Sequence, residues 1–201
     1  MIHTFSDGLL GSNTHVYATK DGEAMLVDCG VPVQGVAAFC EAHGLCVRFL
    51  VLTHGHYDHV GYLDAYREQF PAARVVCHED ELRVLRDPTA NLSAYFGEAC
   101  DLSQGVHGLR EGDVLTLGEG ADAEHFTVLH TPGHTCGCMC LYNEAARVMF
   151  TGDVLFAVGY GRVDLPTASP SAMRASLARL REYRGVTIYP GHGDICLLPQ
   201  T

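Results

Sequence analysis

Residues Leu52–Gly61, LTHGHYDHVG, place three histidines and one aspartate within six consecutive positions. Such side chains need partners once they are buried, so the cluster indicates either a solvated turn or half of a metal site. The run before it, VRFLVLT (47–53), is apolar and rich in Val, Leu and Phe, which predicts a buried strand. The cluster therefore begins where a strand ends, which is where layered α/β proteins place their binding sites.

Apolar runs and helical spacing divide the rest of the chain into two blocks of strands, each closed by helices. Further strands are predicted at 14–19, 24–30, 73–78, 113–117, 126–131, 138–143, 147–153 and 186–194, and helices at 33–44, 59–70, 79–87 and 169–185. Residues 88–112 are mixed in character and are predicted to be an irregular surface excursion. No Ser/Gly-rich linker interrupts the chain, so we expect one domain over residues 1–201. The pattern predicts an α/β fold with two sheets face to face and helices outside.

Composition excludes several classes of partner. The chain has 201 residues, 47% hydrophobic content and a formal net charge of -11, with no Lys/Arg-rich run. Nucleic acid and anionic membrane surfaces both need a positive footprint, so neither is expected as a partner. The sequence shows neither a signal peptide nor a long apolar span, and we expect a cytoplasmic protein that acts on a small molecule. Composition leaves the oligomeric state open.

Nine cysteines in a chain without an export signal favour a reducing compartment. Their number is odd and no C-x-x-C pair is present, so neither a complete disulfide framework nor a zinc ribbon is expected. Cys136, Cys138 and Cys140 stand at alternate positions, and on a strand they would share one face. A soft-metal site is one interpretation of this pattern. Thiols packed as ordinary apolar side chains are the preferred interpretation.

Three further candidate ligands also follow apolar strands. His134 lies in the turn HTPGHT, Asp153 directly follows VMFTG, and His192 lies in PGHG, each beside glycines that permit tight turns. Five imidazoles and two carboxylates exceed the four ligands of one closed zinc site but suffice for two ions that share a carboxylate. The sequence predicts two Zn²⁺ per chain, with iron or manganese as alternatives, held by His54, His56, Asp58, His59, His134, Asp153 and His192.

The order of these motifs resembles that of the metallo-β-lactamase-fold hydrolases, from Asp28 to His192. The matching motifs are THGHYDH (53–59), HTPGHT (130–135), TGDVLF (151–156) and PGHG (190–193). The segment GDVLFAVGYGRVDLP (152–166) further resembles the branch that contains glyoxalase II-like thioesterases and persulfide dioxygenases.

The resemblance implies a four-layer αβ/βα sandwich of two mixed sheets, with the metal site along one edge. It also implies how the ligands divide. One ion would be held by His54, His56 and His134, a second by Asp58, His59 and His192, and Asp153 would bridge the two.

The leading hypothesis is a metal-dependent hydrolase of a small thioester or related acyl compound, in which a metal-bound hydroxide attacks the carbonyl. A lactone or another ester is an alternative substrate for the same chemistry. The runner-up is a mononuclear iron persulfide dioxygenase, with His54, His134 and Asp153 as the iron ligands. A non-catalytic metal or electron-transfer module is a third hypothesis, but this chain contains no further cofactor-binding sequence.

Asp58 is predicted to be catalytic as well as a ligand, because a positioned base must take the proton of the attacking water. Asp28 ends a strand and would either support a ligand histidine or cap the following turn. His130 precedes TPGH and is a candidate support for His134. Asn13 in GSNTH is predicted to be a turn residue.

The loop after Asp153 contains Tyr160, Arg162 and Asp164. Arg162 would either hold a substrate carboxylate or pair with Asp164 and shape the loop. Tyr95 and Phe96, in the irregular stretch, would either wall a pocket or, as such aromatic residues more often do, pin a loop to the body.

Overall fold

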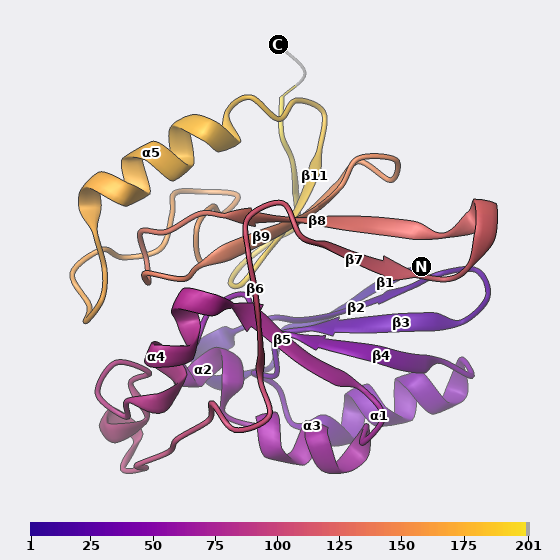
Figure 1. Cartoon of the computed structure of the whole chain (residues 1–201), viewed down its shortest axis with the longest axis horizontal. Coiled ribbons are helices and arrows are strands. Elements are labelled where there is room, and N and C mark those ends of the chain that lie inside the picture. Colours follow the sequence, from indigo (N-terminus) through magenta and orange to yellow (C-terminus); the bar gives the residue numbers. More distant parts are fainter. Residues whose placement is uncertain (200–201) are drawn as a thin grey trace.

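The computed structural model describes residues 1–199, and its strands form two six-stranded sheets (Figure 1). The first sheet contains, in spatial order, β1 (Ile2–Phe5), β2 (Thr14–Ala18), β3 (Glu23–Val27), β4 (Cys46–Val51), β5 (Arg74–His78) and β6 (His107–Leu109). The second contains β12 (Cys196–Leu197), β11 (Thr187–Pro190), β10 (Val148–Gly152), β9 (Met139–Asn143), β8 (Glu124–His130) and β7 (Val114–Leu117). The chain completes the first sheet before it crosses, between β6 and β7, to the second.

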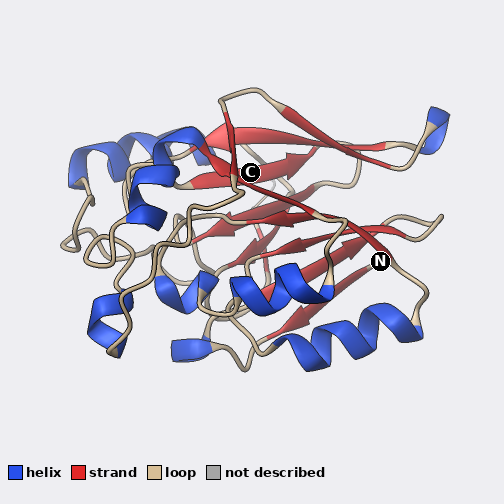
Figure 2. Cartoon of the chain, turned by 60° about the horizontal axis from the view of Figure 1, so that its bottom comes forward, coloured by secondary structure: helices blue, strands red, loops and turns tan. Residues whose placement is uncertain are grey.

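Both sheets are mixed, as predicted. Strands β3 to β6 pair in parallel and β1 to β3 pair antiparallel, whereas in the second sheet only β10 and β11 are parallel among the described pairs. The helices are α1 (Val33–Ala42), α2 (Tyr57–Val60), α3 (Leu63–Gln69), α4 (Leu82–Arg86) and α5 (Pro170–Leu180). Figure 2 shows the strands as two inner layers with helices on both outer sides. The predicted fold class is therefore confirmed.

Strand alternation explains the layering. In β3, Met25 and Val27 point into the core between the sheets, where they meet Phe126 and Phe150 of the second sheet. The intervening Leu26 points outward into a separate core under α1 and α3. Successive side chains of a strand face opposite sides, so a continuous apolar run serves two cores at once.

Helix α5 covers the outer face of the second sheet. Its Ser169 N-cap side chain accepts a hydrogen bond from the Ala172 backbone N–H at 3.3 Å, and Pro170 follows at the first helical position. Met173 and Leu180 of the helix pack in a third core with the thiols of Cys138 and Cys140. These two cysteines act as apolar core residues, as the preferred interpretation predicted, whereas Cys136 is half-buried and accepts a hydrogen bond from Arg83 Nε at 3.2 Å.

The single helix predicted over 59–70 is wrong, because the structure divides it into α2 and α3. The Tyr62 N–H donates to the Cys29 carbonyl at 3.2 Å instead of joining one continuous helix. The Cys29 N–H in turn donates to the His59 carbonyl at 2.7 Å. Backbone contacts with the end of β3 thus outweigh the local helical spacing.

The stretch 88–112 is more ordered than predicted. It contains β6, which extends the first sheet alongside β5, and a short 3₁₀ helix, η3 (Ser93–Phe96). The buried Asn91 side chain donates to the carbonyls of Leu85 and Cys100 at 3.0 and 2.9 Å. Strands β1, β6 and β12 were all missed, since short strands carry little periodic signal.

Between residues 1 and 199, the structure contains no helix of the length and apolar character that crossing a bilayer requires.

Candidate metal centre

The seven predicted ligands come together from loops of both sheets. His54 and His56 follow β4, and Asp58 and His59 lie in α2, on the side of the first sheet. The other three candidates, His134, Asp153 and His192, follow β8, β10 and β11 of the second sheet. Six of the seven side chains form two groups whose nitrogen and oxygen atoms converge, and the seventh, Asp153, lies between them.

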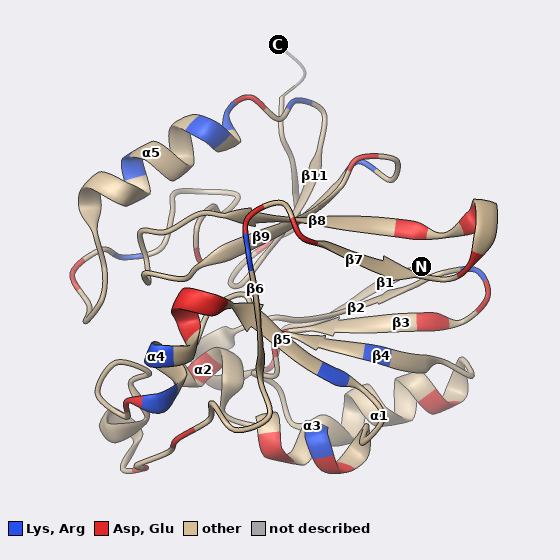
Figure 3. Ribbon diagram, viewed as in Figure 1, with Lys and Arg blue, Asp and Glu red and all other residues tan. Residues whose placement is uncertain are grey.

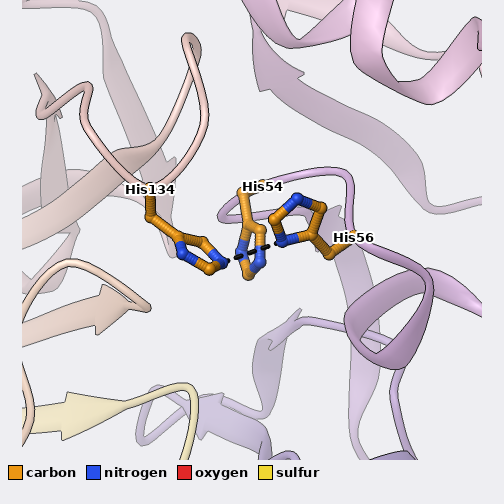
Figure 4. Close-up of side chains that lie close together, drawn as sticks. All are labelled: His54, His56 and His134. Carbon is orange, nitrogen blue, oxygen red and sulfur yellow. Dashed lines mark hydrogen bonds between the residues drawn. The ribbon is translucent and has the colours of Figure 1, made fainter. Parts of the chain in front are cut away.

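The first group is His54, His56 and His134, whose ligand atoms all lie within 4.8 Å of one another (Figure 4). His56 Nδ1 and His134 Nε2 approach to 2.8 Å. His134 Nδ1 lies 2.8 Å from the Arg162 carbonyl oxygen, to which it donates, so its Nε2 presents a lone pair to His56. The Nε2 atoms of His54 and His56 are buried and have no hydrogen-bond partner within residues 1–199.

The second group is Asp58, His59 and His192. His192 Nε2 lies 3.1 Å from His59 Nε2 and 3.2 Å from Asp58 Oδ2. Asp58 Oδ2 also lies 3.5 Å from His59 Nε2. The ligand atoms of these three residues all lie within 4.8 Å of one another.

Asp153 lies between the two groups. Its Oδ1 is 3.4 Å from His59 Nε2, and its Oδ2 is 3.5 Å from His134 Nε2 and 3.7 Å from His192 Nε2. The backbone at Gly191 passes so close to this carboxylate that no side chain fits at position 191. A Cβ there would lie 2.3 Å from Asp153 Oδ1. This glycine allows the two loops to approach so closely.

The donor set fits metal ions. Burial lowers the pKa values of His54, His56 and His134, so these imidazoles are neutral, as metal ligation requires. Burial alone would lower the pKa of His59, but Asp58, Asp153 and Asp28 raise it to about 10. Buried lone pairs that face one another are costly without a cation between them. Two divalent ions would satisfy these atoms.

Asp28 supports His59. Its buried carboxylate accepts hydrogen bonds from the Thr53 N–H and hydroxyl, both at 2.8 Å, and from His59 Nδ1 at 3.0 Å. Its backbone lies in the left-handed region, at φ 63°, which a short polar side chain tolerates. Of the two roles considered from the sequence, the structure shows support of a histidine.

Glu81 was missed by the sequence analysis. It is fully buried, and it accepts hydrogen bonds from the Gly55 N–H at 2.7 Å, the Thr135 hydroxyl at 2.8 Å and the Gly137 N–H at 2.8 Å. Gly55 separates His54 from His56, so this carboxylate ties together the loops that carry the first group. Burial raises its pKa to about 7 against the opposing effect of these three bonds. Its role cannot be recognised from the sequence, because it belongs to the acidic run EDE (79–81), which is typical of a solvated helix face.

Asn13 joins distant parts of the chain and is not simply a turn residue. Its side-chain amide donates to the carbonyls of Pro190 and Gly193 at 2.9 and 3.0 Å, and its N–H donates to the Gly191 carbonyl at 2.7 Å. These bonds fix the loop that carries His192.

His130 lies away from the ligand atoms. Its ring stacks on His78, with centroids 3.7 Å apart, and its Nε2 lies within hydrogen-bond distance, 3.0 Å, of the Cys136 carbonyl oxygen. It thereby holds the turn that contains His134, and within residues 1–199 it forms no hydrogen bond with that side chain.

An open cavity of about 720 Å³ lies over the two groups. His56, Asp58, His134, Asp153 and His192 form its floor.

The remaining predicted residues surround this cavity. Tyr95 and Phe96 wall it, so the pocket interpretation is correct for both. Arg162 pairs with Asp164 through Nε and Nη2, at 2.7 and 2.8 Å. Tyr160 lines a separate cavity near α5.

Comparisons with known proteins place these features in a family context. The sequence profile of the family described as "Metallo-beta-lactamase superfamily" matches residues 7–192. A probable metallo-hydrolase of Streptococcus pyogenes is 32% identical over 191 residues, which are 92% of this chain and 80% of that protein. A hydroxyacylglutathione hydrolase of Haemophilus influenzae is 30% identical over 185 residues, 88% of this chain and 83% of that enzyme.

Two solved structures are similar over nearly the full length. The crystal structure of the B3 metallo-beta-lactamase BLEG-1 has a TM-score of 0.88 and 29% identity, and covers 100% of this chain and 95% of that one. A protein crystallised in a di-iron-bound form has a TM-score of 0.83 and 32% identity, with 97% of this chain and 94% of that one covered.

Proposed function

Because the chain belongs to the metallo-beta-lactamase superfamily, most of whose members are metal-dependent hydrolases, we propose that it hydrolyses a small thioester or related acyl compound. The hydrolase names of the Streptococcus and Haemophilus relatives support this choice. The free state of all nine cysteines agrees with a reducing, cytoplasmic environment, and the net charge of -11 favours a small molecule over nucleic acid or a membrane.

The observation that carries the proposal is the convergence of seven imidazole and carboxylate groups beneath an open cavity, with His54 Nε2 and Asp153 Oδ1 buried and without hydrogen-bond partners among the described residues. In the proposed arrangement, His54, His56 and His134 would hold one ion, Asp58, His59 and His192 would hold the other, and Asp153 would be available to both. We propose zinc as the metal. Metal ions bound there would supply Lewis acidity, which polarises a carbonyl group and makes water acidic enough to deprotonate near neutral pH.

Asp58 is the residue best placed to move a proton. Its carboxylate lines the cavity, and its Oδ2 faces His192 and His59. Burial alone would raise the pKa of Asp58, but these two imidazoles hold it below its usual range, so the group is an anion in the metal-free protein. We propose that Asp58 takes a proton from the attacking water and returns it to the leaving group.

The test compares substrates and metals directly. Zinc- and iron-loaded protein is assayed with a glutathione thioester, a lactone, a simple ester and glutathione persulfide, in air and without oxygen. We expect zinc protein to cleave the thioester equally well in both atmospheres, because hydrolysis consumes only water.

The persulfide dioxygenase is the alternative outcome of the same assay. Oxygen uptake with persulfide on the iron form, without thioester cleavage by either form, would replace the hydrolase by the oxygenase. Cleavage of the lactone or ester alone would keep the hydrolase and change its substrate.

A further inference from the structure

The walls of the cavity are apolar. They are formed by Leu10, Leu92, Tyr95, Phe96, Phe156 and Leu165. Leu10 and Tyr95 are 75% and 74% exposed, so both offer large apolar surface to a ligand. Exposed apolar side chains that gather around one cavity mark a binding surface for apolar groups.

Two of these wall residues have unusual backbone conformations. Leu10 and Leu92 lie in the left-handed region, at φ 53° and 68°. This region is unfavourable for a bulky side chain and persists only where the surrounding structure enforces it. Both leucines line the cavity, so two residues of its apolar wall have strained backbone conformations.

Away from the floor that would hold the metal ions, the wall of the cavity offers little to a negatively charged ligand. Among the described residues that line the cavity, Arg162 is the only Lys or Arg. Its guanidinium donates from both Nε and Nη2 to the carboxylate of Asp164. This pair is neutral overall. A ligand carboxylate that packs against this apolar wall would lose solvation without gaining a cationic partner there, which is costly.

We propose that this cavity selects thioesters whose thiol part is uncharged and apolar, in preference to glutathione, which carries two carboxylates. The proposal rests on the hydrolase function above and specifies its substrate class. The reacting carbonyl would lie over the chelating residues, while the thiol part would pack against Tyr95, Phe96 and Leu165.

The experiment measures binding separately from turnover. Calorimetric titration of metal-loaded protein compares two stable thioethers with the same alkyl chain, S-hexylglutathione and S-hexyl-N-acetylcysteamine. We expect the uncharged compound to bind about tenfold more tightly, because it leaves no carboxylate unpaired. Equal or tighter binding of S-hexylglutathione, or no measurable binding of the uncharged compound, would overturn the proposal.

A pair of variants tests the charge argument. Asp164→Asn removes the carboxylate that pairs with Arg162, so the guanidinium can pair with a ligand carboxylate instead. Binding of S-hexylglutathione should then strengthen by roughly five- to tenfold relative to the uncharged thioether. Asp122→Asn is the matched control, because it removes the same charge at an exposed turn outside the cavity. If both variants change the ratio of the two affinities equally, the Arg162–Asp164 pair does not set selectivity and the proposal is wrong.

A third variant tests the apolar wall. Tyr95→Ser should weaken binding of the uncharged thioether about fivefold and change S-hexylglutathione binding less, because the removed surface is apolar. Equal losses for both ligands, or no loss for either, would contradict the proposal.

Turnover of the corresponding thioesters then separates the two claims. If neither thioester is cleaved while the binding preference holds, the hydrolase proposal fails and the inference about the cavity stands. If both are cleaved and glutathione is preferred, the hydrolase stands and the inference fails.

Discussion

At the level of single residues, the imidazoles of His59 and His134 are each held in place by a hydrogen bond from Nδ1, the ring nitrogen that faces away from the other candidate ligands. His59 donates from Nδ1 to Asp28, and His134 donates from Nδ1 to the Arg162 carbonyl. Each ring therefore turns its Nε2 toward the other candidate ligands. The protein thus sets the tautomer of the neutral His134, whereas His59, whose pKa the carboxylates raise, would give up its Nε2 proton when a metal ion binds.

Replacing Asp58 tests the proposed base. Asp58→Asn keeps the size of the side chain but removes its negative charge and its capacity to accept a proton. We expect kcat to fall by roughly 100-fold or more, with a folded protein. Steady-state assays, circular dichroism and metal analysis check this. Wild-type turnover in a metal-replete variant would remove Asp58 from the mechanism.

Replacing Glu81 tests the link between the ligand loops. Glu81→Gln places an amide N–H against at least one backbone or hydroxyl donor, so we expect a loss of about 1–3 kcal/mol in the free energy of unfolding. Metal affinity should fall roughly 10- to 100-fold, since residues that orient ligands have effects of this size. Urea unfolding and competition with a chromogenic chelator measure the two quantities.

Glu79→Gln is the matched control for this prediction. Glu79 lies two residues away and forms an exposed ion pair with Arg110. Its replacement should change stability by about 0.5 kcal/mol or less and leave metal affinity unaltered. Equal effects of the two variants on metal binding would show that Glu81 has no special role.

The sequence predicted the seven candidate ligands but not the roles of Glu81 and Asn13, which hold the ligand loops in place. Histidine and aspartate directly after an apolar run are conspicuous, because nothing else explains them there. Glu81 stands in an acidic run, and the partners of Asn13 lie about 180 residues away along the chain. Local pattern contains no information about such distant hydrogen bonds. The ligand roles themselves stay predictions.

At the level of elements, long apolar strands were predicted well and short ones were missed. Strands such as β3 and β4 serve two cores, so their apolar runs are unmistakable. Strand β6 has only three residues, HGL, and exists because β5 offers it a free edge. The break between α2 and α3 likewise depends on Cys29, a residue outside the helices.

The loop after β11 provides a prediction at this level. Asn13→Ala removes two side-chain hydrogen bonds to that loop, to Pro190 and Gly193. We expect a loss of about 1–3 kcal/mol in stability and weaker binding of one of the two metal ions, because His192 is no longer held in place. Thermal unfolding and metal titration check both effects.

Asn143→Ala serves as the control for this loop. Asn143 is also buried, and its side chain bonds to Glu124 and Ala146 at the end of β9. Its replacement should lower stability by a similar amount while both metal affinities stay at the wild-type value. A parallel loss of metal affinity in both variants would mean that Asn13 acts only through global stability.

At the level of the whole molecule, the fold class followed from alternating blocks of strands and helices, and the structure confirms it. The pairing order and the exact meeting of the loops could not be derived from periodicity, because they depend on packing between the sheets. That the chain folds as a single domain stays a prediction.

Metal removal is expected to affect the whole structure. We predict two metal ions per chain at full occupancy, because seven donors are too many for one ion. Chelation should lower Tm, since ligands that bind only the folded state stabilise it by mass action. Elemental analysis and calorimetry measure both effects. A crystal with one ion, and with His59 and His192 turned away from it, would contradict the prediction.

The single crossing between the sheets, from β6 to β7, has a consequence for how the protein could be divided (Figure 3). A cut between Leu109 and Val114 would separate two fragments, each with the strands of one complete sheet. Neither fragment would contain a full set of ligands, because each sheet supplies only part of both groups. Reassembly of the two fragments should therefore depend on metal concentration, which would make the divided protein a metal-responsive complementation pair.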